Sequence, residues 1–147
     1  MRTFYFLTIL FVLLAPRAHA GPQEEAFEIL KKWTTAFTMS DVDTITGLYA
    51  ADALFLGTGS KEVVTDPSLI RAYFEQALLN NKPRTATINS YSTYVVSDTV
   101  VVFSGLDIVT GVREGKQFSS PGRVTFVVSK RDSDWKIVQF HRSALPE

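Results

Sequence analysis

The sequence predicts a single α+β domain, with its helices and its main sheet in different parts of the chain. Apolar side chains recur at three- and four-residue spacings in the first half of the chain, interrupted by short strands beginning near residues 49–55. From residue 84 onward, stretches rich in β-branched and aromatic residues follow one another, separated by polar turns. Because these strands are not interleaved with helices, we expect a segregated antiparallel sheet.

Three helices are expected ahead of the long strands. The first spans residues 22–39 and has one apolar face, formed by Ala26, Ile29, Leu30, Trp33, Ala36 and Phe37. Ser40-Asp41 ends this helix and caps a short second one. Asp66-Pro67 begins the third helix, because Asp is a favoured cap and Pro a favoured first residue. Residues 80–83 end it.

Four strands are expected over residues 85–96, 99–109, 117–129 and 134–142. The last two form a hairpin around a polar turn. Residues 99–103 are apolar on both faces, so we expect helices to cover one face and a second subunit the other. The last strand ends in the polar side chains His141, Arg142 and Ser143, and a cation there needs a partner, because burying an unpaired charge is costly.

The last strand also resembles a known family. Residues 135–146 read Trp-Lys-Ile-Val-Gln-Phe-His-Arg-Ser-Ala-Leu-Pro and closely resemble the last strand of the calcium/calmodulin-dependent kinase II association domain. That domain belongs to the nuclear-transport-factor-2-like superfamily, with the SnoaL-like cyclases and ketosteroid isomerases. Tyr-Ala-Ala-Asp-Ala at residues 49–53 is a second point of resemblance. The resemblance implies a cystatin-like cone, in which a curved antiparallel sheet wraps a long N-terminal helix and two further helices complete the fold.

Residues 1–20 are expected to be a cleaved signal peptide, followed by one domain at residues 21–147. Arg2 supplies the positive start, residues 4–15 are almost unbroken in apolar character, and Ala18-His19-Ala20 is a small-x-small cleavage site. The apolar run is shorter than the roughly 20 residues that a membrane-spanning helix needs, which argues against a membrane anchor. We therefore expect a periplasmic or secreted protein with no membrane contact after cleavage.

Several partners and chemistries are not expected from the composition. The formal net charge is zero, which gives no sign of a nucleic-acid partner. The chain has no cysteine, and cleavage would leave His141 as its one histidine, too few ligands for a metal site. No cofactor is predicted. Kinase motifs are missing, and without a basic amphipathic helix calmodulin is not an expected partner.

Arg142 is the first candidate for ligand binding. The resemblance implies that it lines a deep pocket that takes small carboxylates, and a guanidinium offers a carboxylate two parallel hydrogen bonds. The alternative is an internal salt bridge to Asp52 or Asp107. The kinase-linked relatives also place arginines on the two preceding strands, but those positions fall here on Phe126 and near Gly105.

Four further side chains are candidates for the pocket. Arg123 is a candidate replacement for the missing arginines, from another point on its strand. Tyr91 and Tyr94 are candidate lining residues on the first long strand. Trp33 is another, although its place on the apolar face of the first helix is explained more simply by the core.

His141 is a candidate general base, because the reference pKa of histidine lies near neutrality. It is adjacent to Arg142 on a strand, so the two should point to opposite faces. A catalytic role requires His141 to face the cavity within reach of a carboxylate or hydroxyl, and it fails if the ring faces outward. The alternative is a histidine that hydrogen-bonds within the fold or at a subunit contact. Asp52 is either a turn cap or a second catalytic group.

These observations favour a non-enzymatic module over an enzyme. The leading hypothesis is an exported module resembling the kinase II association domain, without kinase activity. It would form a homodimer or larger oligomer through its outer sheet face and hold a small acidic or amphipathic ligand. The alternative is a SnoaL-like or ketosteroid-isomerase-like enzyme for a small hydrophobic carbonyl compound, using His141, Asp52 and a cavity tyrosine. A third hypothesis is a periplasmic binding partner of another protein.

Overall fold

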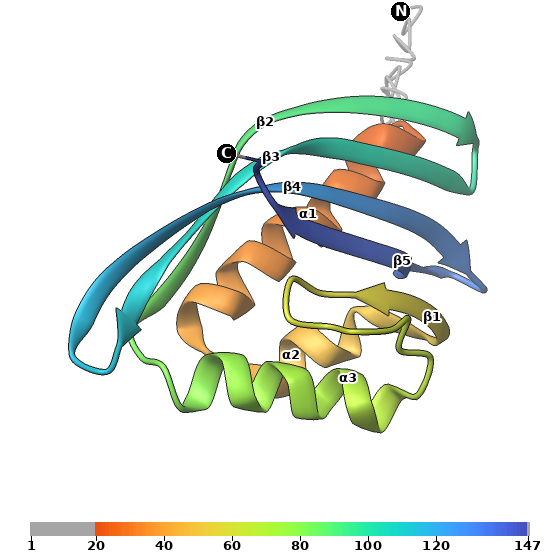
Figure 1. Ribbon diagram of the computed structural model, residues 1–147. Coiled ribbons are helices and arrows are strands. Elements are labelled where there is room, and N and C mark those ends of the chain that lie inside the picture. The colour runs from red at the N-terminus through yellow and green to blue at the C-terminus, as the bar shows by residue number, and fades with distance from the viewer. Residues whose placement is uncertain (1–19, 147) are drawn as a thin grey trace, which may run out of the picture.

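A curved five-stranded sheet arches over three helices in the computed structural model, which describes residues 20–146 (Figure 1). The predicted α+β class is confirmed, with the helices gathered on the concave side of the sheet. Apart from Ala20, the predicted signal peptide lies outside the described residues. No helix within residues 20–146 is long and apolar enough to cross a membrane.

The helices begin at the residues that the sequence predicts. They are α1 (Pro22–Met39), α2 (Val42–Gly47) and α3 (Pro67–Phe74), the last continuing as a π-helical turn (Glu75–Leu79). The Asp41 carboxylate caps α2 by accepting from the Thr44 amide at 2.9 Å. Asp66 caps α3 in the same way. Each cap satisfies an amide at a helix N-terminus that has no partner within the helix.

The strands form one sheet in the order β1-β5-β4-β3-β2. Their bounds are Tyr49–Leu56 (β1), Arg84–Ser97 (β2), Val100–Arg113 (β3), Lys116–Arg131 (β4) and Asp134–Ala144 (β5). The pairs from β2 to β5 are antiparallel, as predicted, whereas β1 runs parallel to β5. These two strands lie far apart in the chain, so no hairpin constrains their direction.

The β3–β4 hairpin extends further than the sequence predicts. The expected strands end at residue 109 and begin again at residue 117, but the observed strands stay paired up to Arg113 and Lys116. Only Glu114 and Gly115 form the loop, both with positive φ values of 51° and 74°. A two-residue turn of this kind matches the twist of the strands, which keeps the ladder intact to the end of the hairpin.

Trp33 lies at the centre of the core, between α1 and the concave face of the sheet. Its indole stacks on Phe37 and Phe140, with ring centroids at 5.1 and 5.5 Å. Its Nε1–H donates a 2.9 Å hydrogen bond to the Tyr49 hydroxyl oxygen. Trp33 is 2% exposed, so nearly all of its side chain is packed in the core, as the simpler explanation of this residue predicts.

Successive side chains along β4 and β5 point to opposite faces of the sheet, which gives one concave set and one convex set. Val124, Phe126, Phe140 and Arg142 are buried, and Phe126 and Phe140 contact Trp33 of α1, so this set marks the concave face. The residues between them in the two strands point to the convex face. No helix covers that face within the described part of the chain.

We predict that Tyr49→Phe lowers the free energy of unfolding at neutral pH by about 1–3 kcal/mol, because the buried Trp33 N–H loses its acceptor. Burial raises the pKa of Tyr49 well above 10.0, and the hydrogen bond from Trp33 offsets part of that rise. The stability from the protonated phenol is complete below the unfolded pKa, near 10, and is lost as pH rises through the folded value. Urea denaturation between pH 8 and 11 measures both effects.

The comparison between wild type and Tyr49→Phe isolates the contribution of the Tyr49 phenol to the pH dependence of stability. Wild type should lose stability more steeply than Tyr49→Phe above about pH 10. Parallel curves for the two proteins would show that the buried phenol does not have a raised pKa.

Candidate functional site

A cavity of about 800 Å³ lies between α1, α3 with its π-helical continuation, and the concave face of the sheet. Polar side chains, among them Gln76, Asn80 and Asn81, line it together with six aromatic residues: Trp33, Phe37, Tyr73, Phe74, Phe118 and Phe140. Arginines supply most of the charge: Arg84, Arg113 and Arg142 line the cavity together with one carboxylate, Glu114. An aromatic-walled space with a few charged groups is typical of a small-molecule site.

Arg142 is buried and bound to three other segments of the fold. Its Nε donates to Asp107 Oδ2 of β3 at 2.7 Å. Its Nη1 donates to Thr58 Oγ1, in the loop after β1, at 2.8 Å. Its Nη2 donates to the Ser120 carbonyl oxygen of β4 at 2.7 Å. The internal salt bridge to Asp107, one of the two alternatives for Arg142, is therefore present, and Arg142 also lines the cavity.

Gly122 leaves the space that this ion pair occupies. A Cβ at residue 122 would lie 2.6 Å from both Arg142 Nη2 and Asp107 Oδ1, closer than non-bonded atoms approach. Asp107 Oδ1 is buried and has no hydrogen-bond partner among the described residues. The ion pair thus neutralises the charge of Arg142 while leaving one carboxylate oxygen unsatisfied.

Sequence reasoning missed the two other cavity arginines, Arg84 and Arg113. Arg84 starts β2 and pairs with Gly111, and Arg113 lies two residues further along β3, so both point to the concave face. The available signal was that Arg84 and Arg113 flank the two expected strands 85–96 and 99–109, which places both arginines at the same, open end of that hairpin. Its use requires the strand register, because a shift of one residue reverses the face.

The remaining ligand-binding candidates do not gather in this cavity. Tyr91 stacks on Phe27 of α1, with ring centroids at 5.1 Å, beside a separate and smaller groove. Tyr94 is 70% exposed on the convex face. Arg123 is also exposed there, with its Nη2 3.4 Å from the Ala144 carbonyl oxygen. It therefore does not replace the missing arginines.

The candidate catalytic pair is not brought together at the cavity. His141 lies between the buried residues Phe140 and Arg142 and pairs with Thr125, which places its ring on the convex face. Asp52 is exposed and forms a 3.3 Å ion pair with Arg131. The hypothesis of an enzyme that uses His141 and Asp52 for proton transfer therefore lacks support, because the two side chains do not meet at the cavity.

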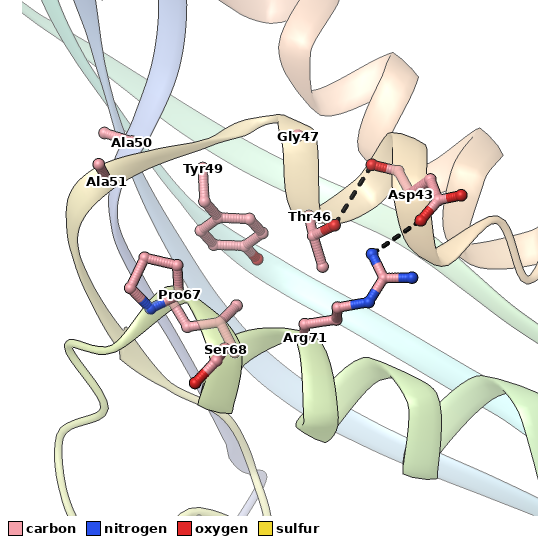
Figure 2. A pocket seen from close by; sticks show the side chains of 10 residues that line it. Asp43, Thr46, Gly47, Tyr49, Ala50, Ala51, Pro67, Ser68 and Arg71 are labelled. Carbon is pink, nitrogen blue, oxygen red and sulfur yellow. Dashed lines mark hydrogen bonds and ion pairs between the residues drawn. The ribbon is translucent and has the colours of Figure 1, made fainter.

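A second hollow, of about 500 Å³, lies between α2, β1 and α3 (Figure 2). Figure 2 shows Arg71 reaching across from α3 to Asp43, and their closest atoms are 2.7 Å apart. Arg71 also pairs with Glu75 at 2.9 Å. Because its cation is already paired with two carboxylates, this hollow is a weaker candidate for an acidic ligand.

Metal ligands do not cluster in the part of the chain that the structure describes. No group of three or more His, Cys, Asp or Glu side chains within residues 20–146 is arranged to hold a metal ion.

Comparison with known proteins now identifies the family. A family model described as a SnoaL-like domain matches residues 27–147. The chain belongs to the SnoaL-like domain family. A comparison with curated proteins gives no match for this SnoaL-like domain.

Solved structures agree with this assignment. A Xanthomonas campestris protein, provisionally described as a calcium/calmodulin-dependent protein kinase II association domain, is 30% identical, with a TM-score of 0.79 over 90% of this chain and 94% of that one. A nuclear-transport-factor-2-like protein of Salmonella enterica is 18% identical, with a TM-score of 0.76 over 86% and 92%. A Caulobacter vibrioides protein with a cystatin-like fold is 12% identical, with a TM-score of 0.74 over 85% and 90%. The predicted resemblance and fold are confirmed.

We predict that Asp107→Asn lowers the free energy of unfolding of this SnoaL-like domain by about 3–5 kcal/mol, because it leaves the buried charge of Arg142 without a counter-charge. Asp52→Asn makes the same chemical change in an exposed ion pair and should cost less than about 1 kcal/mol. Urea denaturation at pH 7 measures both. Equal losses in the two variants would contradict the structural role of the buried pair.

Proposed function

We propose that this SnoaL-like domain is a non-enzymatic binding module that holds a small acidic, amphipathic molecule in its concave cavity. One observation carries the proposal: aromatic walls and three arginines share a single cavity of about 800 Å³. Asp107 neutralises Arg142, and Glu114 is the one carboxylate in the lining, so the cavity keeps an excess of positive charge. An apolar body with a negative group complements this distribution.

Self-association through the convex face is the second part of the proposal. One row of paired residues crosses the sheet on that face, in the order Tyr94, Val102, Val127, Gln139, Leu54. Four of the five are apolar or aromatic, and Tyr94 and Leu54 are 70% and 48% exposed. An exposed apolar patch of this kind is characteristic of an interface, which supports a homodimer or a larger homo-oligomer.

Export is the third part, and it rests on the first 20 residues of the sequence alone. The module would then bind its ligand in the periplasm or outside the cell. Neither calmodulin nor nucleic acid is a proposed partner.

The alternative, an enzyme acting on a small hydrophobic carbonyl compound, receives less support from the geometry. Proton transfer needs an acid or base within hydrogen-bond reach of the bound substrate. Asp52 and His141 both lie away from the cavity, and the titratable side chains lining it are Tyr73, Glu114 and the three arginines. A binding role therefore fits the lining better.

We predict that small monocarboxylates with apolar bodies raise the melting temperature of the protein, whereas their uncharged amides do not. A ligand that binds only the folded state stabilises it by an amount that grows with the logarithm of its concentration divided by its Kd. A thermal-shift series of straight-chain and aromatic acids, each paired with its amide, tests this, and native mass spectrometry of the freshly purified protein tests for a retained acid. No shift with any acid, together with a ligand-free spectrum, would overturn the proposal of an acid-binding module.

We predict that Val127→Glu converts an oligomer to monomers, because it places a charge at the centre of the apolar row on the convex face. Leu69→Glu is the matched control, since Leu69 is 55% exposed on α3, away from the sheet. Sedimentation velocity measures the subunit number, and circular dichroism checks that both variants are folded. A wild-type monomer at micromolar concentration would contradict self-association directly.

A further inference from the structure

The three cavity arginines differ in how many partners they already have. Arg142 has one carboxylate and two oxygen acceptors from its own chain. Arg84 and Arg113 have no carboxylate within 4.0 Å among the residues that the structure describes. An incoming anion would have to compete with Asp107 for Arg142, whereas the other two guanidiniums have no such competitor.

Arg84 is held rigidly and is only partly satisfied. Its Nη1 donates to the Ala77 carbonyl oxygen at 2.7 Å. Ala77 lies in the π-helical turn that continues α3, so this bond connects β2 to that turn. Its Nε is buried and has no hydrogen-bond partner in the described structure. Its guanidinium carbon lies 5.7 Å from the ring centroid of Phe37 and 5.4 Å from that of Phe118. The guanidinium is therefore positioned before any ligand arrives.

Arg113 lies over the same aromatic ring. Its guanidinium carbon is 5.1 Å from the ring centroid of Phe118, so Phe118 carries two cations that repel each other. Burial lowers the pKa of Arg84, and among the charges around it Tyr73 opposes this shift while Arg113 and Arg142 add to it. An arginine stays protonated at neutral pH, so the repulsion persists until an anion binds.

We infer that Arg84 and Arg113 form the anion subsite of the cavity, and that the ligand is an aromatic monocarboxylate. Its carboxylate would lie against the two guanidiniums, and its ring would pack on Tyr73 and Phe118, the two half-buried aromatic side chains of the lining. Arg142 would act as a positioning residue that holds β3, β4 and β5 together beneath the ligand. This inference rests on the proposed function and specifies its ligand class and recognition residues.

The proposed anion subsite lies at Arg84 and Arg113, whereas the family resemblance implies that a carboxylate binds at Arg142. The difference follows from charge, since the Arg142–Asp107 pair is neutral as a unit and offers little attraction to a second carboxylate. The exposed carboxylate of Glu114 also lines the mouth and would disfavour a second negative group on the ligand. A single carboxylate therefore fits better than a diacid.

The test is isothermal titration calorimetry of the purified protein with phenylacetate, and with phenylacetamide as its uncharged isostere. Wild type should bind the acid and bind the amide at least about tenfold more weakly, because each lost charge-assisted hydrogen bond removes about that factor. Arg84→Gln and Arg113→Gln should each weaken phenylacetate binding about 10- to 100-fold and leave amide binding unchanged. Arg123→Gln, on the convex face, is the matched control and should leave both affinities unchanged.

Two separate arginine variants are used because one substitution alone could weaken binding by disturbing the fold. Arg84→Gln also loses the contact to Ala77, whereas Arg113 is exposed and makes no hydrogen bond to the described residues that its removal would break. Phenylacetate binding that survives both substitutions would overturn the inference while leaving the acid-binding function intact. Equal affinity for acid and amide would also overturn it. Failure of the whole carboxylate series in the thermal-shift experiment would instead remove the proposed function itself.

Discussion

The buried ion pair between Arg142 and Asp107 is the interaction on which the cavity depends. Arg142 joins β5 to β3 through the carboxylate, to β4 through the Ser120 carbonyl and to the loop after β1 through Thr58. Burying one of these charges alone would be strongly unfavourable, so each side chain requires the other. The space for the pair exists because residue 122 is a glycine. The cavity end of the sheet is thus fixed by electrostatics, whereas aromatic packing fixes the centre of the cone.

The same pair determines how charge is distributed over the cavity. Because Asp107 neutralises Arg142, the net positive charge lies further out, where Arg84 and Arg113 share the ring of Phe118. Trp33 and Phe140, which also line the cavity, are almost fully buried. The lining therefore combines aromatic side chains with cations that are unpaired in the described part of the chain, which complements the amphipathic acid proposed as the ligand.

The two faces of the sheet have separate roles in this arrangement. Alternation along β5 gives the concave face Phe140 and Arg142, and the convex face His141 between them. The proposed ligand site and the proposed subunit interface therefore share strands without sharing side chains.

The sequence by itself determined the class of fold, the helix starts and the family. Capping residues such as Asp41 and Asp66 act on their immediate neighbours, and the motif around Trp135 and His141 is contiguous, so both are readable from local order. Only the tertiary structure decided which arginines share the cavity, that Arg142 is paired with Asp107, and that Arg123 and Tyr94 face outward. These outcomes depend on strand register and on contacts between distant segments, and a shift of one residue would reverse each facing while leaving the composition of the strand unchanged.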